Sequence, residues 1–166
     1  MLNTSNDIKN PGLNILPPGV ERHVVNGGGL TAFQIFPDDE LEIINNEGNQ
    51  ICEVICFDKD GNSDVGILNL KSNSEKNFTR NILSGKDESI LATNYQLNKR
   101  NLKISNSKSS IIFDKDTKPG EKINLKSKDK CYAIFTAPGE DMDITKQNPP
   151  TDLTIFIKRA KSVGGF

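Results

Sequence analysis

Three thiols and one imidazole are the side chains of this sequence that are best suited to hold a metal ion. The cysteines are Cys52, Cys56 and Cys131, and His23 is the only histidine. Because a strand advances about 3.3 Å per residue, Cys52 and Cys56 in "QICEVICF" would lie roughly 13 Å apart on one face. A shared zinc ion needs both sulfurs about 2.3 Å away, and a disulfide needs Cα atoms within about 7 Å. The spacing therefore predicts a core face of small side chains, with Val54 between the cysteines.

The single histidine limits metal chemistry further. A His-rich centre and a helical His-Glu-x-x-His pair both need a second histidine, so the sequence excludes them. His23 follows Glu21 and Arg22. Its remaining role as a ligand would require Cys131 or an acid as a partner, and this alternative stays open. The sequence predicts no metal site and no catalytic residue within this segment.

Two glycine-containing segments have the composition of ligand loops without their pattern. "DKDGNSD" (58–64) alternates acids, but a calcium loop starting at Asp58 needs glycine and glutamate where Ser63 and Asn69 stand. An Asp-Gly hairpin turn is the better interpretation. "NGGG" (26–29) is followed by the strand-like "LTAFQIF" and not by a helix, as a phosphate loop would be. It predicts a tight turn or a close backbone approach.

Glu53 is the acid whose position is most informative. In the alternating pattern it shares a face with Ile51, Ile55 and Phe57, opposite the cysteines. A carboxylate among apolar neighbours needs a partner, and such residues often mark binding sites. We expect Gln50 and Glu53 to be the ligand-binding residues if this chain has a small-ligand site. The alternative is an edge strand that turns Glu53 to water.

Short β-type segments organise the rest of the chain, and turn residues separate them. They lie at 22–25, 30–36, 40–45, 50–57, 65–70, 101–105, 110–113, 122–125, 131–136 and 153–158. One helix is expected near Phe78 and Ile82, which lie four apart, after a capping box formed by Ser72 and Glu75. The pattern predicts a mainly β fold: an antiparallel β-sandwich or barrel-like domain with one short helix.

Composition indicates a cytoplasmic protein of one domain. The 166 residues include 34% hydrophobic and 26% charged residues, with a net charge of −1, which predicts no nucleic-acid or membrane partner. The odd number of cysteines and the lack of an apolar signal core favour free thiols in a reducing compartment. We expect an extended arm over 1–20, a β-rich domain over 21–160, and a tail or start of a linker over 161–166.

Two segments together resemble a known family. "VVNGGGLTAFQIFPDDELEIINNEGNQICEVICFD" (24–58) is similar to the opening of the urea-carboxylase-associated domain family, with its Gly-rich turn, strand and "D-x-E-G-x-Q-x-x-D" segment. "CYAIFTAPGEDMDITKQNPPTDLTIFIKRA" (131–160) is similar to the closing segment of that family. Gln50 falls on the family's glutamine and Glu53 on its aspartate. The middle of the chain, 66–125, matches weakly.

The resemblance implies a degenerate copy without catalytic function. Enzymes of the family bind zinc through cysteines and a histidine, whereas here Gly139 follows Pro138 and Asn45 replaces the first aspartate. The resemblance places such a copy in the N-terminal region of bacterial demethylases that break trimethylamine N-oxide into dimethylamine and formaldehyde. There it would precede a folate-binding domain like the glycine-cleavage T-protein. It implies that zinc or iron and tetrahydrofolate belong to the parent protein, with no cofactor in this segment.

Three functions follow as alternatives from the sequence. The first is a non-catalytic N-terminal module that packs on downstream domains of the same protein or builds a homo-oligomer. The second is a free-standing metal-dependent enzyme of the amidohydrolase or deiminase type, which acts on a urea- or guanidine-like substrate. The third is a small-ligand-binding β-sandwich in which Gln50 and Glu53 converge on a pocket.

Overall fold

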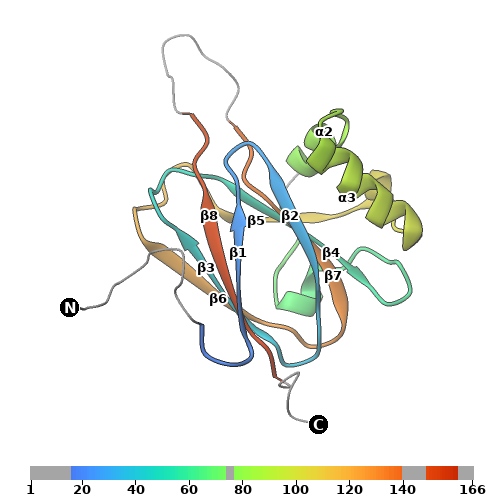
Figure 1. Cartoon of the computed structure of the whole chain (residues 1–166), viewed down its shortest axis with the longest axis horizontal. Coiled ribbons are helices and arrows are strands. Elements are labelled where there is room, and N and C mark those ends of the chain that lie inside the picture. Colours follow the sequence, from blue (N-terminus) through green and yellow to red (C-terminus); the bar gives the residue numbers. More distant parts are fainter. Residues whose placement is uncertain (1–15, 74–76, 140–148, 161–166) are drawn as a thin grey trace, which may run out of the picture.

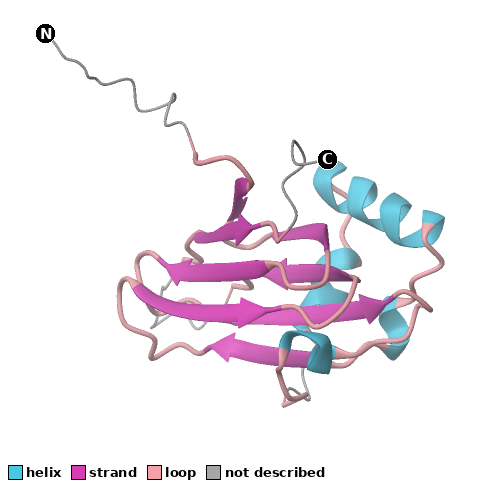
Figure 2. Ribbon diagram, turned by 90° about the horizontal axis from the view of Figure 1, so that it is seen from below, coloured by secondary structure: helices cyan, strands magenta, loops and turns pink. Residues whose placement is uncertain are grey.

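Two four-stranded antiparallel sheets face each other in this chain (Figures 1 and 2). The computed structural model describes residues 16–73, 77–139 and 149–160. The first sheet has the order β1 (Val20–Val25), β8 (Leu153–Lys158), β3 (Glu40–Asn45), β6 (Glu121–Lys126). The second has the order β2 (Leu30–Ile35), β7 (Cys131–Thr136), β4 (Cys52–Asp58), β5 (Ser109–Phe113). The predicted mainly β, antiparallel sandwich is confirmed.

The main core lies between the two sheets. In β3, Leu41 and Ile43 point into it while Glu42 between them is partly exposed, which is the alternation of a strand with one wet face. Strands β4 and β7 are buried almost throughout, because both of their faces are covered. Cys52, Val54 and Cys56 belong to the core between the sheets, as the sequence predicted.

A second, smaller apolar cluster covers the outer face of the β2-β7-β4-β5 sheet. The helices α2 (Phe78–Leu83) and α3 (Glu88–Lys99) contribute Leu83 and Leu97 to it. The sheet contributes Ile55 and Phe57 from β4, together with residues of β7. Figure 1 shows both helices on this side of the molecule. Glu53 therefore lies on a face that the helices cover.

Two predicted strands and one helix boundary need correction. Residues 65–70 form the short 3-10 helix η2 (Val65–Leu68), because the Asp64 carboxylate accepts the Gly66 N–H and Asn69 adopts a left-handed φ of 61°. Residues 101–105 lead into the 3-10 helix η3 (Ile104–Asn106) after the end of α3. The expected helix is present as α2, but Asn77 caps it in place of Ser72. The helix α3 was not predicted.

Both glycine-containing turns have the predicted character. The Asp58 N–H donates to the Asn62 carbonyl at 2.8 Å, and Gly61 adopts a φ of 86° in that turn. At Gly27 an added Cβ would collide with the Pro150 carbonyl oxygen, so the backbones approach closely there. Both features belong to loop geometry.

Some expectations fall outside the described residues. These are most of the arm over 1–20, the capping residue Glu75 and the tail over 161–166. Among the helices of the described part of the chain, none is long and apolar enough to cross a membrane.

Candidate functional site

The carboxylate of Glu53 is buried and holds the start of α2. It accepts hydrogen bonds from the N–H of Phe78 at 3.1 Å, the N–H of Thr79 at 2.9 Å and the Thr79 hydroxyl at 2.7 Å. The Thr79 hydroxyl also lies 2.7 Å from that of Thr136 on β7. Because β4 lies between β7 and β5, the edge-strand alternative for Glu53 is wrong. The partner that a buried carboxylate needs is the first turn of a helix.

Gln50 joins three chain segments just before β4. Its amide nitrogen donates to the carbonyls of Pro138 at 2.8 Å and Ile51 at 2.9 Å, and its amide oxygen accepts the Thr151 N–H at 2.8 Å. The buried Asn45 amide donates to the Gln50 carbonyl at 2.8 Å. These bonds tie the end of β7 to the start of β8. They use the side-chain amide of Gln50 for internal contacts.

The polar cluster around Gln50 is not fully paired. Within the described residues, the Asn45 Oδ1 and Thr151 Oγ1 atoms are buried without a hydrogen-bond partner. Gln50 and Glu53 bond to different partners, and neither lines the cavities described below. Their predicted ligand-binding role remains a prediction. The structure gives each of them internal bonds that stabilise the fold.

The three cysteines are free thiols, and all are buried. Burial raises the pKa of Cys52. The neighbouring Cys131 thiol, together with burial, raises the pKa of Cys56 well above its usual value. This contact follows from the sheet register, in which Cys56 is opposite Ala133 and Cys131 is two residues before it. Strand pairing thus brings Cys131 near Cys56, which the linear spacing of the cysteines did not indicate.

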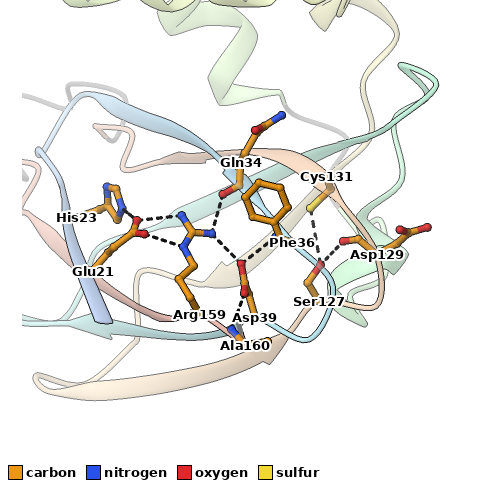
Figure 3. Close-up of polar contacts among 10 residues, drawn as sticks. All are labelled: Glu21, His23, Gln34, Phe36, Asp39, Ser127, Asp129, Cys131, Arg159 and Ala160. Atoms are coloured by element: carbon orange, nitrogen blue, oxygen red, sulfur yellow. Dashed lines mark hydrogen bonds and ion pairs between the residues drawn. The ribbon is translucent and has the colours of Figure 1, made fainter. Parts of the chain in front are cut away.

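A network centred on Arg159 closes one end of the sandwich (Figure 3). The guanidinium donates to both Glu21 oxygens at 2.7 and 2.9 Å, to Asp39 Oδ2 at 2.7 Å and to the Gln34 carbonyl at 3.0 Å. Asp39 also accepts the N–H groups of Phe36 and Ala160. Strands β1 and β2 and the loop before β3 are thereby joined to the end of β8. The arrangement is a closed structural clamp.

The contacts of this network lower the pKa of Glu21 and raise the pKa of Arg159. The hydrogen bonds to Arg159 lower the pKa of Glu21, with a smaller contribution from His23. The hydrogen bond to Glu21 is the main cause of the raised pKa of Arg159. His23 lies 3.2 Å from Glu21 and stacks on Phe33 with a centroid distance of 4.5 Å. Among the described residues, this contact with Glu21 is part of no group of three or more side chains that could hold a metal ion.

The zinc ligands that the family resemblance implies do not fit the described residues. No group of three or more His, Cys, Asp or Glu side chains in this part of the chain is arranged to hold a metal ion. His23 is paired with Glu21, whereas Cys131 lies beside Cys56 and 4.0 Å from the Ser127 hydroxyl. Of the acids in "APGEDMD", Glu140, Asp141 and Asp143 lie outside the described residues.

Sequence reasoning missed the Arg159 clamp because its partners are distant in the chain. Glu21 is 138 residues away and Asp39 is 120 residues away. The available signal was weak. Arg159 directly follows the last β-type segment, and Asp39 lies in the turn before the third β-type segment. Only the pairing of β8 with both β1 and β3 brings these ends together.

Comparison with known proteins gives one informative result. No family model matches the chain. Over 153 residues it is 33% identical to a trimethylamine-oxide aldolase of Ruegeria pomeroyi. This chain is similar to one segment of that aldolase. The match covers 91% of this chain but only 19% of the relative's length, so the chain spans a minor part of the aldolase.

Proposed function

We propose that this chain is a non-catalytic segment of a bacterial enzyme that breaks trimethylamine N-oxide into dimethylamine and formaldehyde. The similarity to a trimethylamine-oxide aldolase over 91% of the chain supports the enzyme class. In this proposal the chain is an N-terminal, cytoplasmic module of the urea-carboxylase-associated type. A downstream domain like the glycine-cleavage T-protein captures formaldehyde on tetrahydrofolate, and zinc or iron belongs to the parent protein.

The observation that carries the non-catalytic role is the internal use of Glu53. A general acid or base must reach substrate within about 3 Å, directly or through one water. Both oxygens of Glu53 instead accept bonds from the first turn of α2, and the side chain is 0% exposed. Gln50 is committed in the same way to Pro138 and Thr151. Both residues thus contribute to stability.

The outer face of the β1-β8-β3-β6 sheet is the surface that we assign to packing on the rest of the enzyme. A hollow of about 410 Å³ lies on it, with Val20 and Phe156 as apolar side chains of this face. Leu41 and Leu125 also border the hollow, but they belong to the core between the sheets. Acidic and basic side chains rim the hollow. The helices α2 and α3 lie on the other sheet, so this face is free of them (Figure 1). Partly exposed apolar side chains among charged ones are compatible with a protein interface.

A turnover assay tests the non-catalytic role. The purified chain is incubated with trimethylamine N-oxide and tetrahydrofolate, in the presence of zinc or iron, and formaldehyde and dimethylamine are measured. We expect no product above the protein-free blank. Multiple turnovers by the chain alone would refute the proposal.

A second assay tests the packing surface. In the enzyme that contains this segment, Phe156→Asp should weaken assembly, measured by light scattering or domain dissociation, because it replaces an apolar side chain of the hollow by a charge. Leu91→Asp is the matched control, since Leu91 is 55% exposed on α3 and lies away from this face. Equal behaviour of the two variants would contradict the assignment of this face.

A further inference from the structure

A second cavity lies at the other sheet, where α3 ends beside the start of β7. Its volume is about 220 Å³. Arg100 and Leu102 line it from the segment after α3, Lys59 from the turn after β4, and Lys130 and Tyr132 from the start of β7. Sites for drug-sized ligands measure roughly 300–1,000 Å³. This cavity therefore suits a smaller molecule.

Positive charge dominates the lining of this cavity. Lys59, Arg100 and Lys130 contribute three cations, and Asp58 contributes the one carboxylate. Asp58 uses its Oδ1 atom to accept the N–H groups of Asp60 at 2.9 Å and Asn62 at 2.8 Å. The backbone N–H groups of its own turn thus partly stabilise the negative charge of Asp58. The cavity retains an excess of positive charge.

Arg100 is held in place by neutral groups. Its guanidinium lies 4.6 Å from the centroid of the Tyr132 ring and donates to the backbone carbonyl and side-chain amide of Gln96. Among the described residues, no ion pair within 4.0 Å joins Arg100, Lys59 or Lys130 to a carboxylate. A stacked guanidinium presents its remaining N–H donors in a planar fork that matches a carboxylate.

The floor of the cavity is apolar. Leu102 is 7% and Tyr132 is 8% exposed, and Cys131 also borders the cavity. The side-chain amide of Gln34 adds a neutral polar group, and Figure 3 shows it pointing away from Arg159. A carbon body can contact the floor while an acid group reaches the cations. The Asp58 carboxylate disfavours a second negative charge on the ligand.

We propose that this cavity, bounded by Arg100, Lys130 and Tyr132, binds a small organic monocarboxylate. Arg100 receives the carboxylate, Lys59 and Lys130 add electrostatic attraction, and Leu102 and Tyr132 contact the carbon body. The proposal is independent of the packing role of the other sheet. Neither the similarity to the aldolase nor the family resemblance assigns ligand binding to these residues.

Titration of the 166-residue chain with butyrate, followed by ¹H–¹⁵N NMR, tests the proposal. We expect saturable shifts of the backbone amides of Lys59, Cys131 and Tyr132, with a dissociation constant of about 1 mM or below. Butyramide, which has the same shape without charge, should cause no saturable shift. Phosphate is the second anion: binding weaker than butyrate supports the proposal, whereas equal or tighter binding would overturn the preference for a monocarboxylate.

Two matched variants locate the site. Arg100→Gln should weaken butyrate binding about tenfold or more, as expected for the loss of a charge-assisted hydrogen bond. Lys99→Gln removes a neighbouring charge of α3 that does not line the cavity, and binding should stay within about twofold because exposed charges are screened by salt. The amide spectra confirm that both variants are folded. Equal weakening by both variants, or no saturable binding to the unmodified chain, would refute the proposal.

Discussion

Arg159 and Arg100 are two arginines in opposite situations. Arg159 is 13% exposed in its side chain and donates to Glu21, Asp39 and the Gln34 carbonyl. Arg100 is exposed, stacks on Tyr132 and has only neutral hydrogen-bond partners among the described residues. The difference separates groups that the fold uses to hold itself together from groups that remain available to a ligand.

Glu53 and Gln50, the residues that the sequence singles out, resemble Arg159, because their side chains bond to other parts of the fold. Glu53 is engaged by Phe78 and Thr79, and Gln50 by Pro138 and Thr151. The structure gives both side chains internal hydrogen bonds, and their predicted ligand-binding role stays a prediction. Whether the hydrogen-bonding groups of a residue already have partners within the protein is a better guide to ligand binding.

The largest expected effect distinguishes the two arginines directly. Arg159→Met should reduce the free energy of unfolding by about 3 kcal/mol or more, because it leaves the carboxylate of Asp39, whose side chain is 2% exposed, without its cation. Arg100→Met should cost about 1 kcal/mol or less, the scale of an exposed cation–π contact. Urea unfolding of both variants measures the difference. Similar losses would remove the distinction between a structural and an available arginine.

A smaller effect is expected for the hydrogen bonds between Glu53 and the start of α2. Thr79→Val keeps the shape of the side chain but removes the hydroxyl that bonds Glu53 and Thr136. The expected loss is about 1–2 kcal/mol, because two buried oxygens each lose a partner. Thr93→Val is the control, since the Thr93 hydroxyl donates to the Ser89 carbonyl within α3. Thermal unfolding measures both losses. A larger loss of stability in Thr93→Val than in Thr79→Val would contradict this role of the Thr79 hydroxyl.

The smallest expected effect depends on pH. The pKa of Glu21 is lowered in the folded chain, mainly by its hydrogen bonds to Arg159. Its contribution to stability is therefore complete above the ordinary carboxyl pKa of 4.5 and is lost as pH falls through the lower folded value. Near neutral pH, Glu21→Gln should cost about 1 kcal/mol, as for a partly exposed ion pair.

Unfolding in urea across this pH range gives the test. The difference between the unmodified chain and Glu21→Gln should shrink as the solution becomes more acidic than 4.5. Glu42→Gln removes a carboxylate that lies outside the Arg159 network and corrects for the change in net charge. If the difference in the free energy of unfolding grows on acidification, the pKa of Glu21 is not lowered by folding and the prediction is wrong.

The strands could be predicted because their signals are local. Residues 131–136 and 153–158 alternate or run apolar between turn residues, and they coincide with β7 and β8. Residues 65–70 were misassigned as a strand because caps decide that segment: Asp64 starts a 3-10 helix and Asn69 ends it. The helix α3 has a cap at Asp87, but Leu97 is its one buried hydrophobic residue, so apolar periodicity is weak.

The environment of the candidate residues could be predicted only in part. Strand alternation placed Glu53 correctly on the face opposite Cys52 and Cys56. Whether β4 is an edge or a central strand depends on pairing with β7 and β5, which is not encoded nearby in the chain. The cavity beside Arg100 has the same origin, since β2, β4, β7 and the segment after α3 each supply part of it.

The central proposal is that Glu53 stabilises the fold and takes no part in catalysis. Its most direct test is Glu53→Gln, with the free energy of unfolding of the chain and the kcat of the enzyme that contains it measured together. We predict a loss of about 1–3 kcal/mol in stability, because the buried bonds to α2 weaken, with kcat per folded enzyme unchanged. A large fall in kcat without loss of stability would contradict the proposal and assign Glu53 to an active site.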